Sequence, residues 1–147
     1  MTEAFIEVVD WLDATYEALS RNEIDLFLTS FSPQARWNVA GAGSGFPFTG
    51  LRVGQDAIRQ LIGEIYSEFR MRDFFIEDII ANENSAAVRW SALATSIATG
   101  RPSQVEVFDH IVIREGLIVS LTQFLDTAAI ASAAGKMRPV VVEKTLD

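Results

Sequence analysis

The segment VEVFDHIVIREGLIVSLTQFLD, residues 105–126, decides the fold. Two runs rich in β-branched residues flank an Arg-Glu-Gly-Leu turn at 114–117, which predicts a long antiparallel hairpin. Polar residues interrupt the apolar pattern at Asp109, His110, Gln123 and Asp126. A half-buried carboxylate on a strand is costly unless it is hydrogen-bonded, paired or protonated. We therefore expect the hairpin to line a pocket with a polar end.

The composition is that of one soluble globular domain, with 147 residues of which 49% are hydrophobic and 22% charged. We expect this domain over residues 1–135, followed by a tail at 136–147. The formal net charge of −8 disfavours binding to nucleic acid or to an anionic membrane. With no Cys and one His, we expect neither a metal site nor a disulfide. The lack of Cys and of a signal-peptide pattern predicts a cytoplasmic protein.

The rest of the chain predicts helices first and strands afterwards. Apolar residues at helical spacing predict a helix over about residues 3–20, and a second short helix that stops before Pro33. The elements predicted next are a strand at 36–40, a glycine-rich loop at 41–50, a helix capped by Asp56, strands at 74–81 and 86–98, the hairpin, and a short helix at 127–134. The loop lacks the Lys and the strand-to-helix context of a phosphate loop, so we do not expect nucleotide binding there.

Helices that precede a run of four antiparallel strands are typical of the α+β class. We expect a curved antiparallel sheet of about four to six strands wrapped around three helices. A sheet of this kind forms a cone with an open mouth, and the polar residues of the hairpin would point into it.

Short motifs with corresponding order and spacing run along nearly the whole domain, from about residue 5 to 130. They are YEAL (16–19), WNV (37–39), PFTG (47–50) running into GQDAI (54–58), VRW (88–90) and FLDTA (124–128). Together they resemble the nuclear transport factor 2-like superfamily, with its cystatin-like fold, and within it the ketosteroid isomerase-like and SnoaL-like polyketide cyclase group. The fold hosts isomerases, dehydratases, cyclases, epoxide hydrolases and binding proteins, so the resemblance leaves the activity open.

The resemblance to ketosteroid isomerases implies an incomplete catalytic set. Their oxyanion-stabilising acid would correspond to Asp109, and its tyrosine partner to Thr15 or, with a shift of one residue, to Tyr16. Their carboxylate base would fall on Val39, beside Asn38, and neither side chain abstracts a proton.

The resemblance to limonene epoxide hydrolases implies an incomplete set as well. Arg89 corresponds to the arginine that helps to activate water in those enzymes. Ser91 and Gln123 stand where two aspartates would be expected. For the polyketide cyclases no residue correspondence is drawn, so that chemistry stays open.

The residues themselves indicate where chemistry would take place. Asp109 lies in phase with an apolar strand face, so burial would raise its pKa and make it a general acid or an oxyanion donor. A structural carboxylate bound to backbone amides is the alternative. Tyr16 and Arg89 would polarise the substrate, although Tyr16 also fits the core and Arg89 also fits a pair with Asp109. Gln123 would orient the ligand, His110 would point to the opposite face, and Asp126 would cap the last helix.

The remaining pocket residues are expected to be wall residues that favour a flat, apolar ligand. They are Trp37, Phe46, Phe48, Trp90, Ser91 and Leu125.

Three functional hypotheses follow. The first is a protein that binds a hydrophobic, polyketide- or steroid-like molecule and catalyses cofactor-free isomerisation, cyclisation or dehydration. The second is a carrier or sensor with the same pocket and no catalysis. The third is an interaction module that forms a homodimer through the sheet, with an apolar outer face built from Trp90, Phe108, Ile118 and Phe124.

Overall fold

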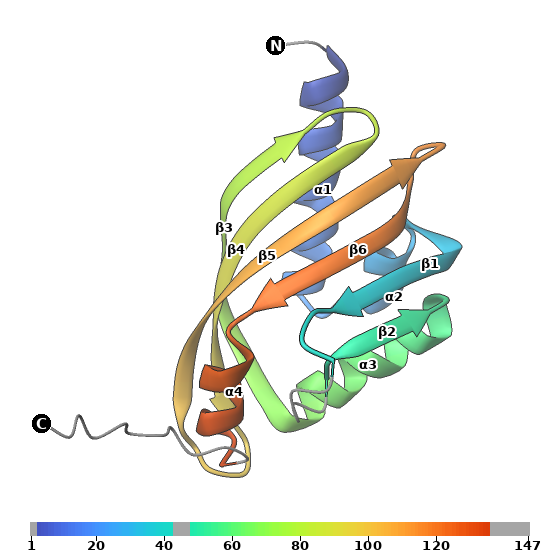
Figure 1. The fold of residues 1–147 in the computed structure, drawn as a ribbon. Helices are drawn as coiled ribbons and strands as arrows, with labels where there is room; N and C mark the ends of the chain where they lie inside the picture. Colours follow the sequence, from blue (N-terminus) through green and yellow to red (C-terminus); the bar gives the residue numbers. More distant parts are fainter. Residues whose placement is uncertain (1–2, 43–47, 136–147) are drawn as a thin grey trace, which may run out of the picture.

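The computed structural model describes residues 3–42 and 48–135, and the predicted order of elements is confirmed there (Figure 1). The elements are α1 (Glu3–Ser20), α2 (Ile24–Leu28), β1 (Phe31–Val39), β2 (Gly50–Val53), α3 (Gln55–Glu68), β3 (Phe69–Ala81), β4 (Ser85–Ser96), β5 (Pro102–Arg114), β6 (Leu117–Leu125) and α4 (Thr127–Ala133). Strand β2 was not predicted. The predicted tail at 136–147 lies outside the described residues.

The strands form one six-stranded sheet in the order β2-β1-β6-β5-β4-β3. The sheet is strongly curved and not closed, and the helices α1, α2 and α3 lie on one side of it (Figure 1). This is the α+β fold that the sequence predicts. Four of the five strand pairs are antiparallel as expected, whereas β1 and β6 run parallel.

The hairpin of β5 and β6 sets the register of the polar residues. Its turn residues Glu115 and Gly116 both have positive φ, 52° and 74°, as in the tight two-residue turns that match the twist of a hairpin. A register shift between Val112 and Ile113 lies next to this turn, and the turn and the shift together place Asp109 directly opposite Gln123 on the neighbouring strand. The predicted turn at 114–117 is therefore confirmed.

The helix ends show one predicted cap and one unexpected cap. Asp126 caps α4, and its Oδ1 accepts a hydrogen bond from the Ala129 N–H at 3.0 Å, as predicted. The cap of α3 is Gly54, with φ 91°, and not Asp56, which lies in the first turn. The chain turns sharply between β2 and α3, and a positive φ is far easier for glycine.

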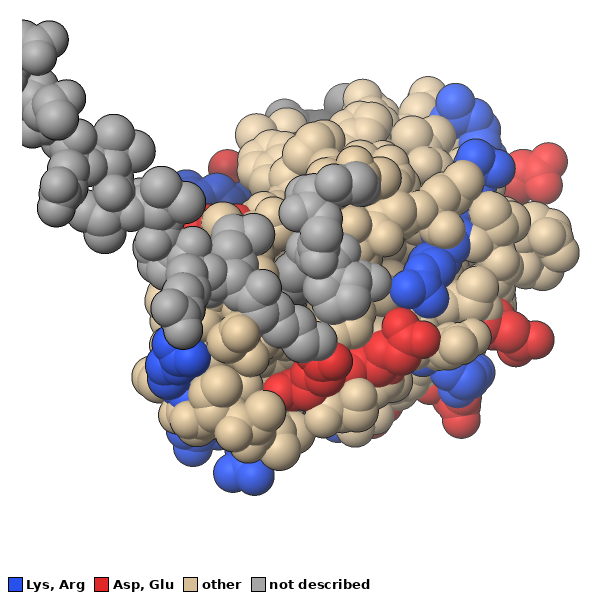
Figure 2. All heavy atoms as spheres, turned by 60° about the horizontal axis from the view of Figure 1, so that its bottom comes forward, with Lys and Arg blue, Asp and Glu red and all other residues tan. Residues whose placement is uncertain are grey.

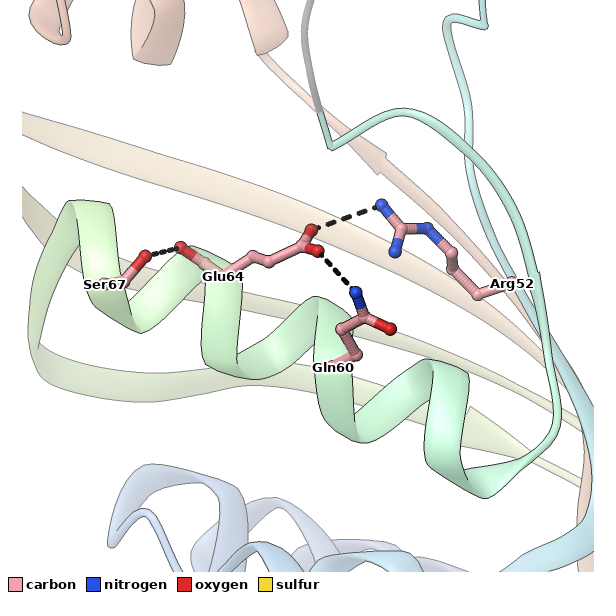
Figure 3. A network of polar contacts seen from close by, with 4 residues as sticks. All are labelled: Arg52, Gln60, Glu64 and Ser67. Carbon is pink, nitrogen blue, oxygen red and sulfur yellow. Dashed lines mark hydrogen bonds and ion pairs between the residues drawn. The ribbon is translucent and has the colours of Figure 1, made fainter.

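A polar network joins the edge strand β2 to α3 (Figure 3). The Glu64 carboxylate accepts hydrogen bonds from Arg52 of β2 at 3.4 Å and from the Gln60 amide at 3.2 Å. The Ser67 hydroxyl donates to the backbone carbonyl of Glu64 at 2.6 Å. We call Arg52, Gln60, Glu64 and Ser67 the α3 network.

The surface carries charges of both signs. On the face that includes the lower end of the molecule in Figure 1, acidic and basic side chains are interspersed among uncharged ones (Figure 2). None of the helices described in residues 3–135 is long and apolar enough to span a bilayer.

Candidate functional site

A buried carboxylate with three donors lies inside the cone. Asp109 is 1% exposed, and its Oδ2 accepts hydrogen bonds from the Tyr16 hydroxyl at 2.5 Å and from the Trp90 indole N–H at 2.8 Å. Its Oδ1 accepts a hydrogen bond from the Gln123 amide at 3.1 Å. We call Tyr16, Trp90, Asp109 and Gln123 the Asp109 cluster.

Four elements bring the Asp109 cluster together. Strand β5 lies between β4 and β6, so Asp109 has Val88 opposite on one side and Gln123 on the other. Trp90 is two residues beyond Val88 and shares its face, because strand side chains alternate. Tyr16 reaches Asp109 from α1, 93 residues away in the chain.

Burial dominates the electrostatics of the Asp109 cluster. It raises the pKa of Asp109 from 3.8 to about 6, against the opposing effect of the three hydrogen bonds. Burial and the nearby Asp109 carboxylate raise the pKa of Tyr16 well above its usual value. The partners of Asp109 all donate to it, which is the arrangement that an ionised carboxylate needs. Asp109 is thus an acceptor at neutral pH and becomes a donor only when protonated.

Two small apolar cavities lie beside the Asp109 cluster. The first has a volume of about 80 Å³ and the second about 60 Å³, and both are lined by Ile65, Met71, Trp90 and Gln123. Asp109 itself lines neither cavity and lies behind Trp90 and Gln123. These volumes exceed the space of one water molecule but are well below the roughly 300–1,000 Å³ of typical ligand sites.

An open surface groove of about 370 Å³ adjoins both cavities. It shares Tyr66 and Met71 with the second cavity, and Phe69 and Met71 with the first. The side chains of Tyr66 and Met71 are only partly buried. Methionine is flexible and adapts easily to a new shape. Met71 is therefore the adaptable side chain that the groove and both cavities share.

The structure brings several residues singled out in the sequence to this region. Tyr16, Asp109 and Gln123 belong to the Asp109 cluster, with Trp90 as an addition. The predicted wall residues Phe48 and Leu125 line the first cavity, and Trp37 lines the second. Phe46 lies outside the described residues.

Arg89 and Ser91 lie on the other face of the sheet, so the predicted strand phase is wrong for them. The Arg89 side chain is 53% exposed and lies 3.8 Å from Glu106, while the Ser91 hydroxyl donates to Glu77 at 3.3 Å. The reason is that Val88 and Trp90 occupy the inner positions of β4. Arg89 therefore neither pairs with Asp109 nor lines the cavities.

The outer face of the sheet carries large apolar side chains. Phe108 and Phe124 lie opposite each other on β5 and β6, and both are about half exposed. The dimer hypothesis also placed Trp90 and Ile118 there, but they are 6% and 1% exposed, which corrects that hypothesis. Trp90 instead lines both cavities, as expected of a wall residue. Other exposed members are Phe75 and Ile80, and His110 is exposed as predicted.

The donor role of Trp90 was not predicted, although the sequence carried a signal for it. Trp90 shares a strand phase with the apolar Val88 and Ala92, so its ring was bound to be buried. A buried indole N–H usually finds a hydrogen-bond acceptor. Asp109, the carboxylate predicted on the apolar face of the neighbouring strand, was the obvious acceptor for Trp90. In contrast, the buried Nε1 of Trp37 has no partner among the described residues.

Within residues 3–42 and 48–135, His, Asp and Glu side chains do not gather in a group of three that could hold a metal ion.

The chain belongs to the SnoaL-like domain family, which matches residues 12–121. An NTF2-like protein of unknown function from Burkholderia pseudomallei is similar in structure, with a TM-score of 0.78, 20% identity, and coverage of 86% of this chain and 95% of that chain. A candidate isomerase from Rhodopseudomonas palustris is also similar, with a TM-score of 0.71, 25% identity, and coverage of 92% and 99%.

A third similar structure is a candidate SnoaL-like polyketide cyclase from a Jannaschia species. It has a TM-score of 0.75 and 12% identity, and the match covers 95% of this chain and 98% of that chain. No functionally curated protein is similar enough to be matched. These similarities establish the NTF2-like fold and the family.

Proposed function

We propose that this protein binds a hydrophobic small molecule inside the cone and acts on it by cofactor-free proton transfer, as in isomerisation, cyclisation or dehydration. The observation that carries the proposal is the carboxylate of Asp109, which is buried behind two apolar cavities and accepts hydrogen bonds from three neutral donors. A carboxyl group with a pKa near 6 can take up or release a proton near neutral pH, as acid–base catalysis requires.

In its ionised form Asp109 acts as the base that the resemblance to ketosteroid isomerases did not provide at Val39. Tyr16 holds the carboxylate in place through its hydroxyl. Proton transfer requires Gln123 to swing away from Asp109, which exposes Oδ1 to a ligand in the cavities. Gln123 thus separates the ligand from the reactive group until it is displaced.

The cavities define the size and polarity of the ligand. Benzene fits a cavity of about 150 Å³, so neither cavity, of about 80 and 60 Å³, holds a ring by itself, and a single ring requires the two to merge. A polyketide- or steroid-like polycycle fits only when Met71 and Tyr66 move toward the groove. The names of the isomerase and cyclase candidates that share the fold support the proposed reaction classes.

Deuterium exchange tests for proton transfer without knowledge of the natural substrate. Cyclohexanone in D₂O is expected to exchange its α-protons faster with the wild-type protein than with Asp109→Asn, followed by proton NMR. Binding of the ketone without exchange would contradict the proposed catalysis and support only the proposed ligand binding. Absence of both binding and exchange would count against the proposal as a whole.

A carrier or sensor without catalysis is the second candidate. The observation that favours it is the apolar and buried Val39, which is 2% exposed and lies where the resemblance to ketosteroid isomerases implies their carboxylate base. Binding of ring compounds without exchange or any other turnover separates this candidate from the first.

We further propose that a second copy of the chain packs on the outer sheet face. Phe75, Ile80, Phe108 and Phe124 are 61%, 64%, 46% and 50% exposed, and a cluster of this kind on a sheet is typical of an interface. Replacement of Phe108 with Glu is expected to shift the protein from dimer to monomer in light scattering. A wild-type monomer contradicts this assembly.

A further inference from the structure

Gln123 is the polar side chain that both cavities share. Its Nε2 donates to Asp109 at 3.1 Å. The orientation of the amide follows from chemistry, because an ionised carboxylate accepts hydrogen bonds and donates none. The NH₂ group must therefore face Asp109, and the carbonyl oxygen Oε1 is turned away from it.

The Oε1 atom of Gln123 has no hydrogen-bond donor in the described part of the chain. Among the described residues, Trp37 Nε1 is the one fully buried side-chain nitrogen or oxygen atom that lacks a hydrogen-bond partner. Because Oε1 has no partner and is not among such fully buried atoms, a small part of its surface must be accessible, although Gln123 as a whole is only 7% exposed. Because Gln123 lines both cavities, Oε1 is an unpartnered acceptor at their wall.

We propose that Asp109 orients the Gln123 amide so that its carbonyl oxygen accepts a hydrogen bond from a phenolic or enolic hydroxyl group of the ligand. The inference rests on the proposed function, because it takes the two cavities as the ligand site. It adds the chemical class of the ligand, which is an apolar ring that carries a hydrogen-bond donor.

A change at Asp109 can turn the Gln123 amide, so that it presents a hydrogen-bond donor instead of an acceptor to the ligand. The Trp90 indole can only donate, so in Asp109→Asn the carbonyl oxygen of the new side chain must take the place of Oδ2. Its NH₂ group then replaces Oδ1 and faces Gln123. The Gln123 amide has to turn, which presents NH₂ to the cavities. The variant thereby converts an acceptor for the ligand into a donor.

Protonation of Asp109 at Oδ1 also turns the Gln123 amide in the wild-type protein, because Oδ1 then donates a hydrogen bond to Gln123. The groups that face Asp109 are the Tyr16 hydroxyl from α1, the Trp90 indole from β4 and the Gln123 amide from β6. Of these only Tyr16 is titratable, and it stays protonated because its pKa is raised. In the described ranges no charged side chain forms a hydrogen bond or ion pair with Asp109, whose three partners are all neutral.

Three probes with the same tolyl group test the inference. The probe p-cresol carries a donor and stays protonated at neutral pH, p-tolunitrile carries only an acceptor, and p-xylene carries neither. At about pH 7.5 the wild-type protein is expected to bind p-cresol about fivefold more tightly than p-tolunitrile. Asp109→Asn is expected to reverse this order, and the wild-type protein at about pH 5 to shift in the same direction. Dissociation constants from NMR titration provide the measurement.

Gln123→Met is the matched control, because it keeps the length of the side chain and removes the amide. It is expected to lose the discrimination between p-cresol and p-tolunitrile at both pH values. An unchanged order in Asp109→Asn overturns the inference, and the wild-type titration at about pH 5 decides the matter if that variant does not fold. Equal binding of all probes overturns the inference and leaves the ligand site intact. Absence of binding at millimolar concentration contradicts the proposed function, and the inference fails with it.

Discussion

Asp109 and Glu64 are both carboxylates that accept hydrogen bonds from more than one side chain, but one lies inside the cone and the other at its edge. Glu64 faces the charged Arg52 and the Gln60 amide, and its side chain is 39% exposed (Figure 3). Asp109 faces only neutral donors and is 1% exposed. Water thus helps to stabilise the charge of Glu64, whereas only protein groups stabilise the charge of Asp109.

This difference shows how the fold makes a reactive group from an ordinary side chain. Hydrogen bonds from neutral donors offset only part of the free energy of removing a charge from water. The remainder appears as the raised pKa of Asp109. An ion pair at the surface keeps much of its contact with water, so its net contribution to stability is small.

Removal of the Asp109 carboxyl group is expected to have the largest effect. Asp109→Ala leaves the buried donors of Tyr16, Trp90 and Gln123 without an acceptor. Asp109→Asn keeps an acceptor for Trp90 and a partner for Gln123. We expect Asp109→Ala to unfold with a free energy about 3 kcal/mol below that of Asp109→Asn in urea denaturation. Equal stabilities would mean that water satisfies the exposed donors, and the cluster would then not be sealed.

The pH dependence of stability is expected to reveal the same carboxyl group. Its pKa rises from 3.8 to about 6 on folding, so the folded state holds the proton more tightly, by about 3 kcal/mol. This contribution is fully present below about pH 4, is lost as the pH rises to about 6, and stays constant above that value. The unfolding free energy of the wild type minus that of Asp109→Asn should fall across this window. A flat difference would contradict the raised pKa.

Loss of the Tyr16 hydroxyl is expected to have a smaller effect on stability and a specific effect on titration. Tyr16→Phe removes a hydrogen bond that lowers the pKa of Asp109, so that pKa should rise further above its usual value. We expect a loss of about 2 kcal/mol, since the bond is made to a charged group. Carboxyl carbon NMR reports the titration directly.

Tyr66→Phe is the matched control for Tyr16→Phe. The Tyr66 hydroxyl donates to the Leu19 carbonyl at 3.2 Å and does not contact Asp109. The titration of Asp109 should therefore be unchanged in this variant. A similar shift in both tyrosine variants would assign the effect to a general loosening of the core.

Local patterns predicted most of the fold. The spacing of apolar residues predicted α1, and the turn residues predicted the hairpin, because both depend on neighbours in the chain. Helix α2 ends at Leu28, before Pro33 as predicted, but β1 begins earlier than predicted and includes Pro33. The pairing of β1 with β6 shifts register between Phe31 and Arg36, and this irregularity accommodates a residue without a backbone N–H.

The Asp109 cluster was only partly predictable. The apolar phase of β5 pointed to a buried Asp109, but the contact with Tyr16 joins residues 93 positions apart and depends on how α1 packs into the cone. The phase of β4 was assigned from the resemblance, which placed Arg89 inward. Burial of the larger apolar Trp90 on the alternate face outweighs any benefit of burying a guanidinium group.

The smallest effect is expected in the α3 network. Glu64→Gln keeps the side-chain shape and removes the charge that faces Arg52 at 3.4 Å. We expect a loss of at most about 0.5 kcal/mol, because both side chains are partly exposed and salt screens the pair. The loss should shrink further in high salt, as measured by urea denaturation. A loss as large as that in Tyr16→Phe would show that the edge of the cone is as tightly coupled as its interior, and the contrast between the two carboxylates would then not stem from burial.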